Sequence, residues 1–360
     1  MTNKTIILIL VSISIVSAIV YLESRKTKGT GNVQEVVDVV PREMQSKSSK
    51  SGKYELAKEI TTPDGFINTS KDFKLTDIIG KKVILIDFWT YSCINCQRTT
   101  PYLNAWYEKY KVQGLEIVGI HTPEFDFEKD TKNVSEAVKK YGIKFPVVLD
   151  NDYSTWQAYK NRYWPRKYLI DIDGYIVYDH IGEGAYDETE REIQKALEER
   201  NAVLGENNSI PSDIVTPEKV ISVNPKMPLS PEIYFGSSRN ENLANGQAGY
   251  AGKQSFTAPS KVKTDNLYLD KEWDIQAEYA QNLSSNAKIL FGYQAKNVYF
   301  VAESNESNIV HILRDGKEIN KLEIKGAGSY QIIADEGYGE HVLEIVIEKP
   351  GLKAFTFTFG

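Results

Sequence analysis

The sequence predicts an α/β domain with a partly parallel sheet, followed by an all-β sandwich or jelly roll. Between residues 54 and 200, short apolar runs of strand type alternate with helical patterns, as in sheets whose strands are joined by helices. Over residues 231–360, short strands follow one another and no helical pattern appears. A length of 360 residues suits two domains of ordinary size.

The α/β pattern begins with Val83–Trp89, a continuous apolar run of the kind found in central strands that are buried on both faces. A helical pattern follows Cys93 and is closed by Gly114. The remaining segments continue the alternation with strands at Leu115–His121 and Phe145–Asp150, helices at Asn133–Tyr141, Asp152–Tyr159 and Glu188–Arg200, and a hairpin at Tyr168–Gly182 whose turn is Asp173-Gly174.

The β pattern follows residues 201–230, which are rich in proline and lack sustained periodicity, so that they predict a linker. The second domain should then occupy residues 231–360. Its strands are expected at Val298–Glu303, Ile309–Ile319 with a turn at Asp315-Gly316, Ser329–Asp335, His341–Lys349 and Lys353–Gly360.

An uncharged apolar segment of 18 residues lies near the N-terminus, from Thr5 to Leu22. As a helix it spans about 27 Å, close to the hydrocarbon core of a bilayer. One interpretation is a signal peptide that is cleaved after Val16-Ser17-Ala18. The apolar run continues beyond that site, so we favour an uncleaved membrane anchor over residues 1–22.

Residues 23–53 are rich in Lys, Ser, Gly, Glu and Gln, and they predict a disordered tether. Because the segment before the anchor is very short, we expect the bulk of the chain on the extracytoplasmic side of the cell membrane, or secreted if the segment is cleaved. The net charge of −6 disfavours nucleic-acid binding, since proteins that bind nucleic acids are usually basic.

Both cysteines of the chain lie in one CxxC, at Cys93 and Cys96. Zinc needs two further ligands, but there is no second CxxC, and His121 has no partner at ligand spacing. Haem attachment needs a histidine at position 97, where the chain has Gln97. A structural disulfide across two residues closes too small a loop to stabilise the fold much. Dithiol–disulfide redox chemistry is the function that remains.

The strand before the CxxC delivers Cys93 to the N-terminus of a helix, where unpaired N–H groups and the helix dipole favour a thiolate. Cys93 is the expected nucleophile, and the more shielded Cys96 is expected to resolve the mixed disulfide. Asp87 lies six residues before Cys93 in the apolar strand. Burial should raise its pKa, so that it can accept the proton of Cys96. The alternative is a strand-edge carboxylate that is bonded to the backbone.

Trp164-Pro165 precedes the strand that begins at Tyr168, and an X–Pro bond in this place is a candidate cis peptide. A cis-proline there would bring a backbone edge beside the thiols, ready to pair with a substrate chain. An ordinary trans proline in a loop is the alternative.

Four segments resemble the thioredoxin-like part of DipZ-type proteins, relatives of the TlpA and ResA oxidoreductases. The resemblance lies in DFWTYSCINCQRTTPYLNAWYEKY, GIHTPEFDFEKD, the run from NVSEAVKK to WPRKYLID, and GEGAYDETE, and it spans residues 54–200. The tail resembles the β-sandwich that follows the thioredoxin domain in those proteins, through SPEIYFG, the Asp315-Gly316 turn and the terminal FTFTFG.

This resemblance implies a thioredoxin fold in which Cys93 attacks and Cys96 resolves. Either Asp87 or Glu124, in the HTPEF loop, would assist proton transfer, and a surface glutamate after a strand is the alternative for Glu124. Pro165 would be cis. The expected substrate-binding residues are Trp89, Trp164 and Pro165. No cofactor is expected beyond the redox-active Cys93–Cys96 disulfide, and no metal.

DipZ-type chains normally begin with a CcdA-like domain of several membrane spans, whereas one span is predicted here. We therefore expect electrons to come from a separate CcdA/DsbD-like membrane donor, unless the protein works as an oxidant. Its substrates would be protein thiols and disulfides.

The C-terminal domain resembles carbohydrate-binding modules and is rich in aromatic residues. These aromatics could stack on a glycan or could simply pack the sandwich; they are Tyr250, Tyr268, Trp273, Tyr279, Tyr293 and Tyr299. The alternative function is therefore a cell-surface binding protein with the thioredoxin domain as a scaffold. A peroxidase is a third and weaker hypothesis, because Thr90-Tyr91-Ser92 does not supply the Pro/Thr-rich loop that usually precedes a peroxidatic cysteine.

Overall fold

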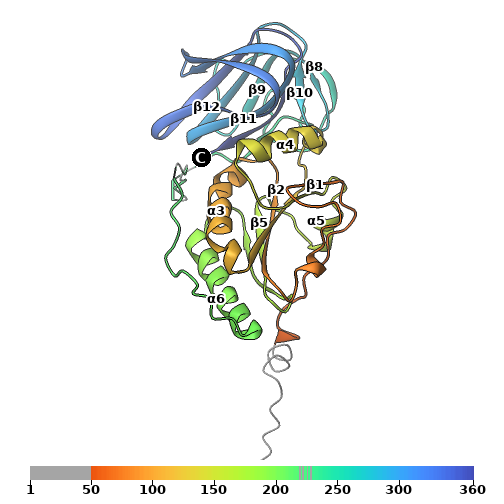
Figure 1. Ribbon diagram of the computed structural model, residues 1–360. Helices are drawn as coiled ribbons and strands as arrows, with labels where there is room; N and C mark the ends of the chain where they lie inside the picture. The colour runs from red at the N-terminus through yellow and green to blue at the C-terminus, as the bar shows by residue number, and fades with distance from the viewer. Residues whose placement is uncertain (1–49, 219, 221–222, 225, 228) are drawn as a thin grey trace, which may run out of the picture. The chain divides into compact units, whose positions relative to one another are not determined.

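Two β-sheets carry most of the regular structure in the computed structural model (Figure 1). The structure describes residues 50–360, except 219, 221, 222, 225 and 228. The anchor predicted over residues 1–22 and nearly all of the tether predicted over 23–53 lie outside these residues. Within the described part of the chain, no helix is both long enough and apolar enough to cross a membrane.

The first sheet has six strands in the order β1-β4-β3-β2-β5-β6. Strand β2 is parallel to β3, and β3 is parallel to β4, whereas the other pairs are antiparallel. The predicted α/β class with a partly parallel sheet is thus confirmed. The strands are β1 (Gly65–Ile67), β2 (Val83–Trp89), β3 (Leu115–His121), β4 (Val147–Leu149), β5 (Arg166–Ile170) and β6 (Ile176–Ile181).

Helices cover both faces of this sheet, because successive residues of β2 point to opposite sides. Val83, Leu85 and Trp89 pack with residues of α3, α4 and α6, whereas Ile84 and Phe88 pack with residues of α5 and η1. Figure 1 shows α3 and α6 on one side of the sheet and α5 on the other. These helices are η1 (Leu75–Asp77), α3 (Ile94–Tyr110), η2 (Lys111–Gln113), η3 (Asp126–Lys129), α4 (Thr131–Lys140), α5 (Ser154–Ala158) and α6 (Tyr186–Leu204).

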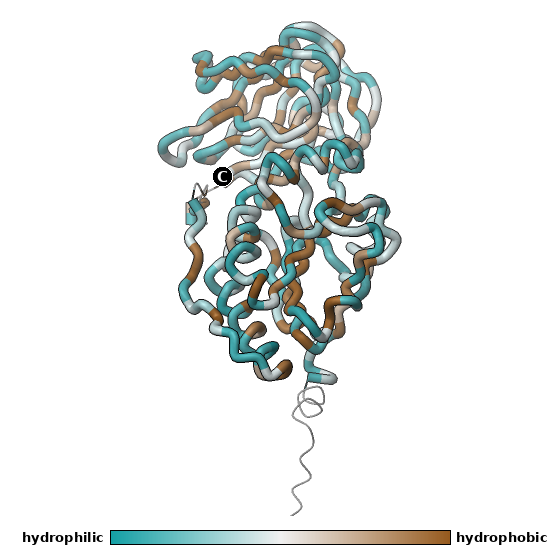
Figure 2. Tube along the Cα trace, viewed as in Figure 1, coloured by the Kyte–Doolittle hydropathy of each residue, from teal (hydrophilic) through white to brown (hydrophobic). Residues whose placement is uncertain are grey.

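The hydropathy pattern agrees with this layering. In Figure 2 the apolar residues gather along the central strands, while α6 is largely hydrophilic on the side drawn. Strands β2 and β3 are buried at every position, as the continuous apolar runs predict. The apolar strands therefore form the core on which the helices pack.

The second sheet is all antiparallel and has seven strands, in the order β12-β11-β13-β10-β9-β8 with β7 beside β13. Strand β11 pairs with β9 through Lys288–Phe291 and with β13 through Val298–Glu303. The sheet therefore folds around one apolar core. The strands are β7 (Ile233–Tyr234), β8 (Gly252–Phe256), β9 (Leu267–Ile275), β10 (Ala280–Asn282), β11 (Ala287–Arg314), β12 (Lys317–Ile347) and β13 (Lys353–Phe359).

The all-β prediction for this region is confirmed, but two of its strands are much longer than predicted. Strands β11 and β12 have 28 and 31 residues and contain several register shifts. These irregularities bend a long strand without ending it, so the sequence pattern breaks into shorter pieces. The Asp315-Gly316 turn joins the two strands as predicted, and both residues have positive φ, 53° and 78°.

An apolar cluster joins the residues of the two sheets. It consists of Phe125, from the segment after β3, and Val301 and Phe355, from β11 and β13. All of the described residues belong to one compact unit. The predicted domain boundaries, with the linker over 201–230, stay a prediction.

Candidate active site

Helix α3 begins immediately after Cys93, which is its N-cap residue with φ −69° and ψ 117°. The Cys93 carbonyl accepts a hydrogen bond from Gln97 N at 3.0 Å. No side chain caps the helix, so N–H groups of its first turn remain available to a negative charge. The Cys93 thiol is half-buried and free. The sequence thus places one accessible cysteine at a helix N-terminus, as predicted.

Cys96 lies one turn further along and is 1 % exposed. Burial, together with the neighbouring Cys93 sulfur and the charge of Asp87, raises the pKa of Cys96 well above its ordinary value. Cys93 Sγ lies 4.0 Å from the carbonyl oxygen of Trp164. The dithiol is therefore asymmetric, with one sulfur that a substrate can reach and one that stays protonated until it is needed.

Asp87 points to the same face of β2 as Val83, Leu85 and Trp89, which is the face covered by α3. It is 2 % exposed, and among the described residues its Oδ1 atom has no hydrogen-bond partner. Burial raises the pKa of Asp87 to about 7, and the charge of Lys167 opposes this shift. The carboxyl group is thus buried beside the dithiol and near its pKa at neutral pH.

Lys167 is the residue that sequence reasoning missed. It is fully buried and lies directly opposite Asp87 in the register of β2 and β5. Its ammonium group donates to the carbonyl oxygen of Gly182 at 3.1 Å. Burial lowers the pKa of Lys167, whereas the charges of Asp87 and Cys96 raise it. The available signal was a lysine two residues after Pro165, directly before the apolar run Tyr168–Ile170.

The Trp164–Pro165 peptide is cis, which confirms the candidate cis bond. Trp164 is half-buried; its indole N–H donates to Thr122 O at 2.9 Å, and its ring packs on Trp156. Trp89 is only 3 % exposed and packs edge-on against a neighbouring histidine ring. Of the two tryptophans predicted to bind substrate, Trp164 is therefore the one that a bound chain can reach. The roles of both stay predictions.

Glu124 faces the β domain. Its carboxylate accepts hydrogen bonds from Arg239 at 2.7 Å and from the Tyr234 hydroxyl at 3.0 Å. Among the described residues, no hydrogen bond joins it to either cysteine. Glu128 lies nearer to the CxxC, since its carboxylate accepts from both the backbone N–H and the hydroxyl of Ser92. Burial raises the pKa of Glu128, and these hydrogen bonds oppose the shift.

His121 ends β3 and is fully buried. It stacks on Tyr91 with ring centroids 5.8 Å apart. Burial lowers the pKa of His121 to about 3, so the imidazole is neutral in the folded protein. This agrees with a packing role at the end of the strand.

The aromatic residues of the β domain mostly pack its interior. Trp273 and Tyr293 are fully buried, and Tyr268 and Tyr299 are less than a tenth exposed. Tyr250 is the exposed exception, at 53 %. These rings do not form an exposed platform, and the structure favours packing over glycan stacking.

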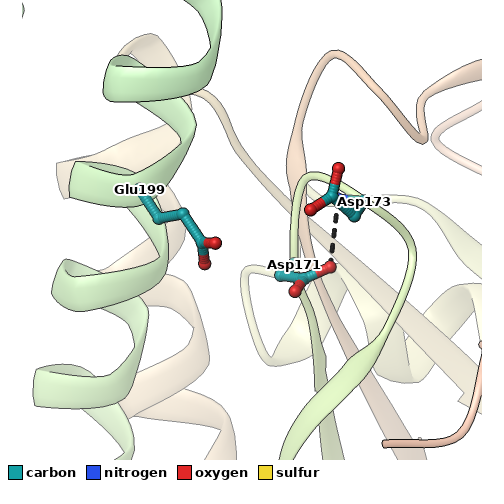
Figure 3. A group of neighbouring side chains, drawn as sticks. All are labelled: Asp171, Asp173 and Glu199. Atoms are coloured by element: carbon teal, nitrogen blue, oxygen red, sulfur yellow. Dashed lines mark hydrogen bonds between the residues drawn. The ribbon is translucent and has the colours of Figure 1, made fainter. Parts of the chain in front are cut away.

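One group of three carboxylates among the described residues lies close enough together that it could hold a metal ion. Figure 3 shows Asp171, Asp173 and Glu199 converging from the β5–β6 hairpin and from α6. The ammonium group of Lys50 lies 2.6, 3.1 and 2.5 Å from these carboxylates. The cluster therefore holds the lysine at the start of the described chain, and its position at the far end of β5 separates it from the CxxC.

Two protein-family models match the chain. The model described as Redoxin matches residues 57–197, and the model described as Thioredoxin like C-terminal domain matches residues 230–360. Together they cover the two sheets and the CxxC.

Several known proteins are similar to the chain. Protein DipZ of Mycobacterium tuberculosis is 38 % identical over 308 residues, which are 83 % of this chain and 43 % of DipZ. The chain thus spans less than half the length of that relative. Thiol-disulfide oxidoreductase ResA of Bacillus cereus is 31 % identical over 160 residues, 42 % of this chain and 84 % of ResA.

A solved structure adds a fold comparison. The thioredoxin domain of a thiol-disulfide oxidoreductase from Bacteroides vulgatus is 26 % identical, with a TM-score of 0.33, over 39 % of this chain and 96 % of that one.

Proposed function

Because the chain belongs to the thioredoxin-like thiol–disulfide oxidoreductases of the ResA type, we propose that it exchanges disulfides with protein substrates through Cys93 and Cys96. The observation that carries this proposal is the asymmetry of the dithiol. Cys93 is half-buried at a helix N-terminus, and Cys96 is buried beside Asp87. An accessible nucleophile beside a shielded thiol suits the two steps of disulfide exchange, attack on the substrate and resolution of the mixed disulfide.

In the reducing direction, the Cys93 thiolate attacks one sulfur of a substrate disulfide. The substrate S–S bond breaks, the more distant sulfur leaves as a thiolate that takes up a proton, and a mixed disulfide forms between Cys93 and the substrate. The free N–H groups at the start of α3 stabilise the attacking thiolate. The cis Trp164–Pro165 segment lies beside Cys93 and offers backbone for pairing with the substrate chain.

Resolution requires the Cys96 thiol to lose its proton in a buried place. Asp87 is the available acceptor, because burial raises the pKa of Asp87 to about 7. The resulting Cys96 thiolate attacks Cys93 Sγ, and the second substrate sulfur leaves as a thiolate that takes up a proton from Asp87 or water. Two electrons have passed to the substrate, and the chain holds a Cys93–Cys96 disulfide.

This disulfide must be reduced before another turnover in the same direction. We assign that step to a membrane dithiol donor of the CcdA/DsbD type, and we place the described residues on the extracytoplasmic side of the cell membrane. The apolar segment Thr5–Leu22 supports this location. In an oxidising role the same steps run in reverse.

The proposal is tested by insulin reduction with the full chain and dithiothreitol as electron source. The wild type should accelerate the reaction, and Cys93→Ser should reduce the rate to that of dithiothreitol alone. Incubated with insulin in the absence of dithiothreitol, Cys96→Ser should instead accumulate mixed disulfides that disappear when dithiothreitol is added, because its nucleophile remains and its resolving thiol is gone. Equal turnover by the wild type and Cys93→Ser would refute the proposal.

A further inference from the structure

A pocket of about 360 Å³ adjoins the CxxC where α3 meets strands β11 and β12. Helix α3 contributes Ile94, the residue after Cys93, together with Arg98. The long strands contribute Tyr299 and Ser329. Ile94 and Arg98 lie in the first two turns of α3, directly after Cys93, so the wall of the pocket lies near the nucleophile.

Arg98 is a buried cation with unused hydrogen-bonding capacity. Its side chain is 2 % exposed, and it pairs with Glu183 through Nε and Nη2, both at 2.8 Å. Its Nη1 atom packs against Gly360 and makes no hydrogen bond of acceptable geometry within the described residues, and the Tyr299 hydroxyl lies next to the guanidinium. A buried N–H group without an acceptor is costly, and an incoming anion would relieve that cost.

The β domain adds two more unpaired polar atoms. The Tyr299 and Ser329 hydroxyls are buried and have no hydrogen-bond partner of acceptable geometry in the described structure, although Tyr299 lies next to the Arg98 guanidinium. Tyr299 pairs with Gln331 across β11 and β12, and Ser329 lies two residues from Gln331 on the same face. The wall therefore carries several groups that can donate to one acceptor.

Lys140, at the end of α4, gives the pocket a net positive charge. Glu183 balances Arg98, whereas among the described residues no carboxylate lies within ion-pair distance of Lys140. Its ammonium group lies 5.4 Å from the centre of the Tyr141 ring, which also lines the pocket. Hydrogen-bond donors without a partner, together with a cation that has no counter-ion, can bind a carboxylate group.

We propose that this pocket is a substrate subsite, which binds an aspartate or glutamate side chain next to the cysteine that Cys93 attacks. The inference rests on the proposed function and specifies its substrate class. It also gives the β domain a direct part in substrate selection, because Tyr299 and Ser329 supply two of the three unpaired donors. Acidic residues beside a substrate disulfide should therefore speed the first exchange step.

The test uses peptides of the form acetyl-X-Cys-X-amide, in which the cysteine carries a 2-pyridyl disulfide and X is Glu, Gln or Lys. Attack by Cys93 forms the Cys93–peptide disulfide and expels pyridine-2-thione, whose absorbance gives the second-order rate constant. The reduced full-length chain should react with the Glu peptide about tenfold faster than with the Gln peptide, which corresponds to about 1.4 kcal/mol. The Lys peptide should be slower than the Gln peptide.

Variants connect the preference to the pocket. In the double variant Lys140→Gln/Tyr299→Phe, the Glu-to-Gln rate ratio should fall below about threefold, because one cation and one donor are lost. Lys139→Gln is the matched control, since Lys139 is the exposed lysine just before Lys140 and does not line the pocket. Its ratio should equal that of the wild type.

Three outcomes would overturn the inference. If the wild type reacts equally with the Glu and Gln peptides, the proposed function survives and the subsite does not. If no peptide reacts faster than with Cys93→Ser, the proposed function itself fails. If the Glu and Gln peptides react equally, but oxidised glutathione reacts faster than its carboxyl ester, the pocket binds small disulfides that carry carboxylates and not a polypeptide.

Discussion

Replacing Asp87 by asparagine should stabilise the protein at alkaline pH and much less at acidic pH. The carboxyl is buried, and its pKa is about 7 in the folded protein against an ordinary value of 3.8. A carboxyl whose pKa is raised by folding binds its proton more tightly in the folded state. The wild type therefore loses stability as the pH rises from about 4 to about 7, and Asp87→Asn does not.

The size of the effect follows from that window. Between pH 5 and pH 7 the carboxyl is ionised in the unfolded chain but protonated in the folded protein, so the wild type loses about 1.36 kcal/mol of stability per pH unit. The stability of Asp87→Asn relative to the wild type should therefore rise by about 2.7 kcal/mol between pH 5 and pH 8. Any change in packing caused by the substitution alters the free energy of unfolding equally at both pH values, so it does not affect this difference. Loss of the Asp87 charge also lowers the pKa of Lys167 further, and this acts in the same direction.

The assay is urea unfolding of the dithiol form at pH 5 and pH 8, followed by near-UV circular dichroism. Asp72→Asn is the control, because Asp72 is an exposed aspartate. Its stability difference from the wild type should not change between the two pH values. If Asp87→Asn destabilises the protein equally at both, Asp87 is a stabilising partner of Lys167 and the reasoning fails.

Three further predictions concern cations that face carboxylates. Lys167→Met should move the pH midpoint of mixed-disulfide resolution upward by about one unit, because the charge of Lys167 lowers the pKa of Asp87; an unchanged midpoint in stopped-flow measurements would contradict this. Arg239→Met should reduce the free energy of unfolding by about 2 kcal/mol, since Glu124 loses its cation, whereas Arg239→Lys should recover part of it. Lys50→Met should cost more stability at pH 7 than at pH 4, because three converging carboxylates then repel one another, and thermal unfolding at both pH values checks this.

The sequence was sufficient to predict the parts of the site that depend on local pattern. A continuous apolar run predicts that β2 is buried on both faces, so Asp87 within it was expected to be a buried acid. The spacing of Cys93 and Cys96 puts one at the N-cap and the other one turn inside α3. These inferences need only the periodicity of strands and helices.

Lys167 could not be assigned from such patterns, because its partner comes from another strand. Asp87 and Lys167 are far apart in the chain and meet only through the register of β2 and β5. The same holds for Glu124, whose partner Arg239 lies in the loop between β7 and β8. Two glutamates in one loop, Glu124 and Glu128, look equivalent in the sequence, and only tertiary contacts separate them.

The long strands of the β domain escaped prediction for a related reason. Hydrophobic alternation locates a strand only while its register holds, and the bulges in β11 and β12 reset that register several times. The pocket beside Cys93 was invisible in the sequence because its walls come from α3, α4 and both long strands. A site assembled from such distant segments leaves no local motif.

The buried groups behind the dithiol explain how Cys96 can ionise without a new buried charge. Lys167 faces both Asp87 and Cys96, and each of their charges raises its pKa. When the Cys96 proton moves to Asp87, the negative charge moves from a carboxylate to a thiolate and stays near the same ammonium group. The number of buried charges is unchanged, so the step avoids the large cost of desolvating another ion. The three groups should therefore titrate as one coupled set, in which replacing any member shifts the pH dependence of the resolving step.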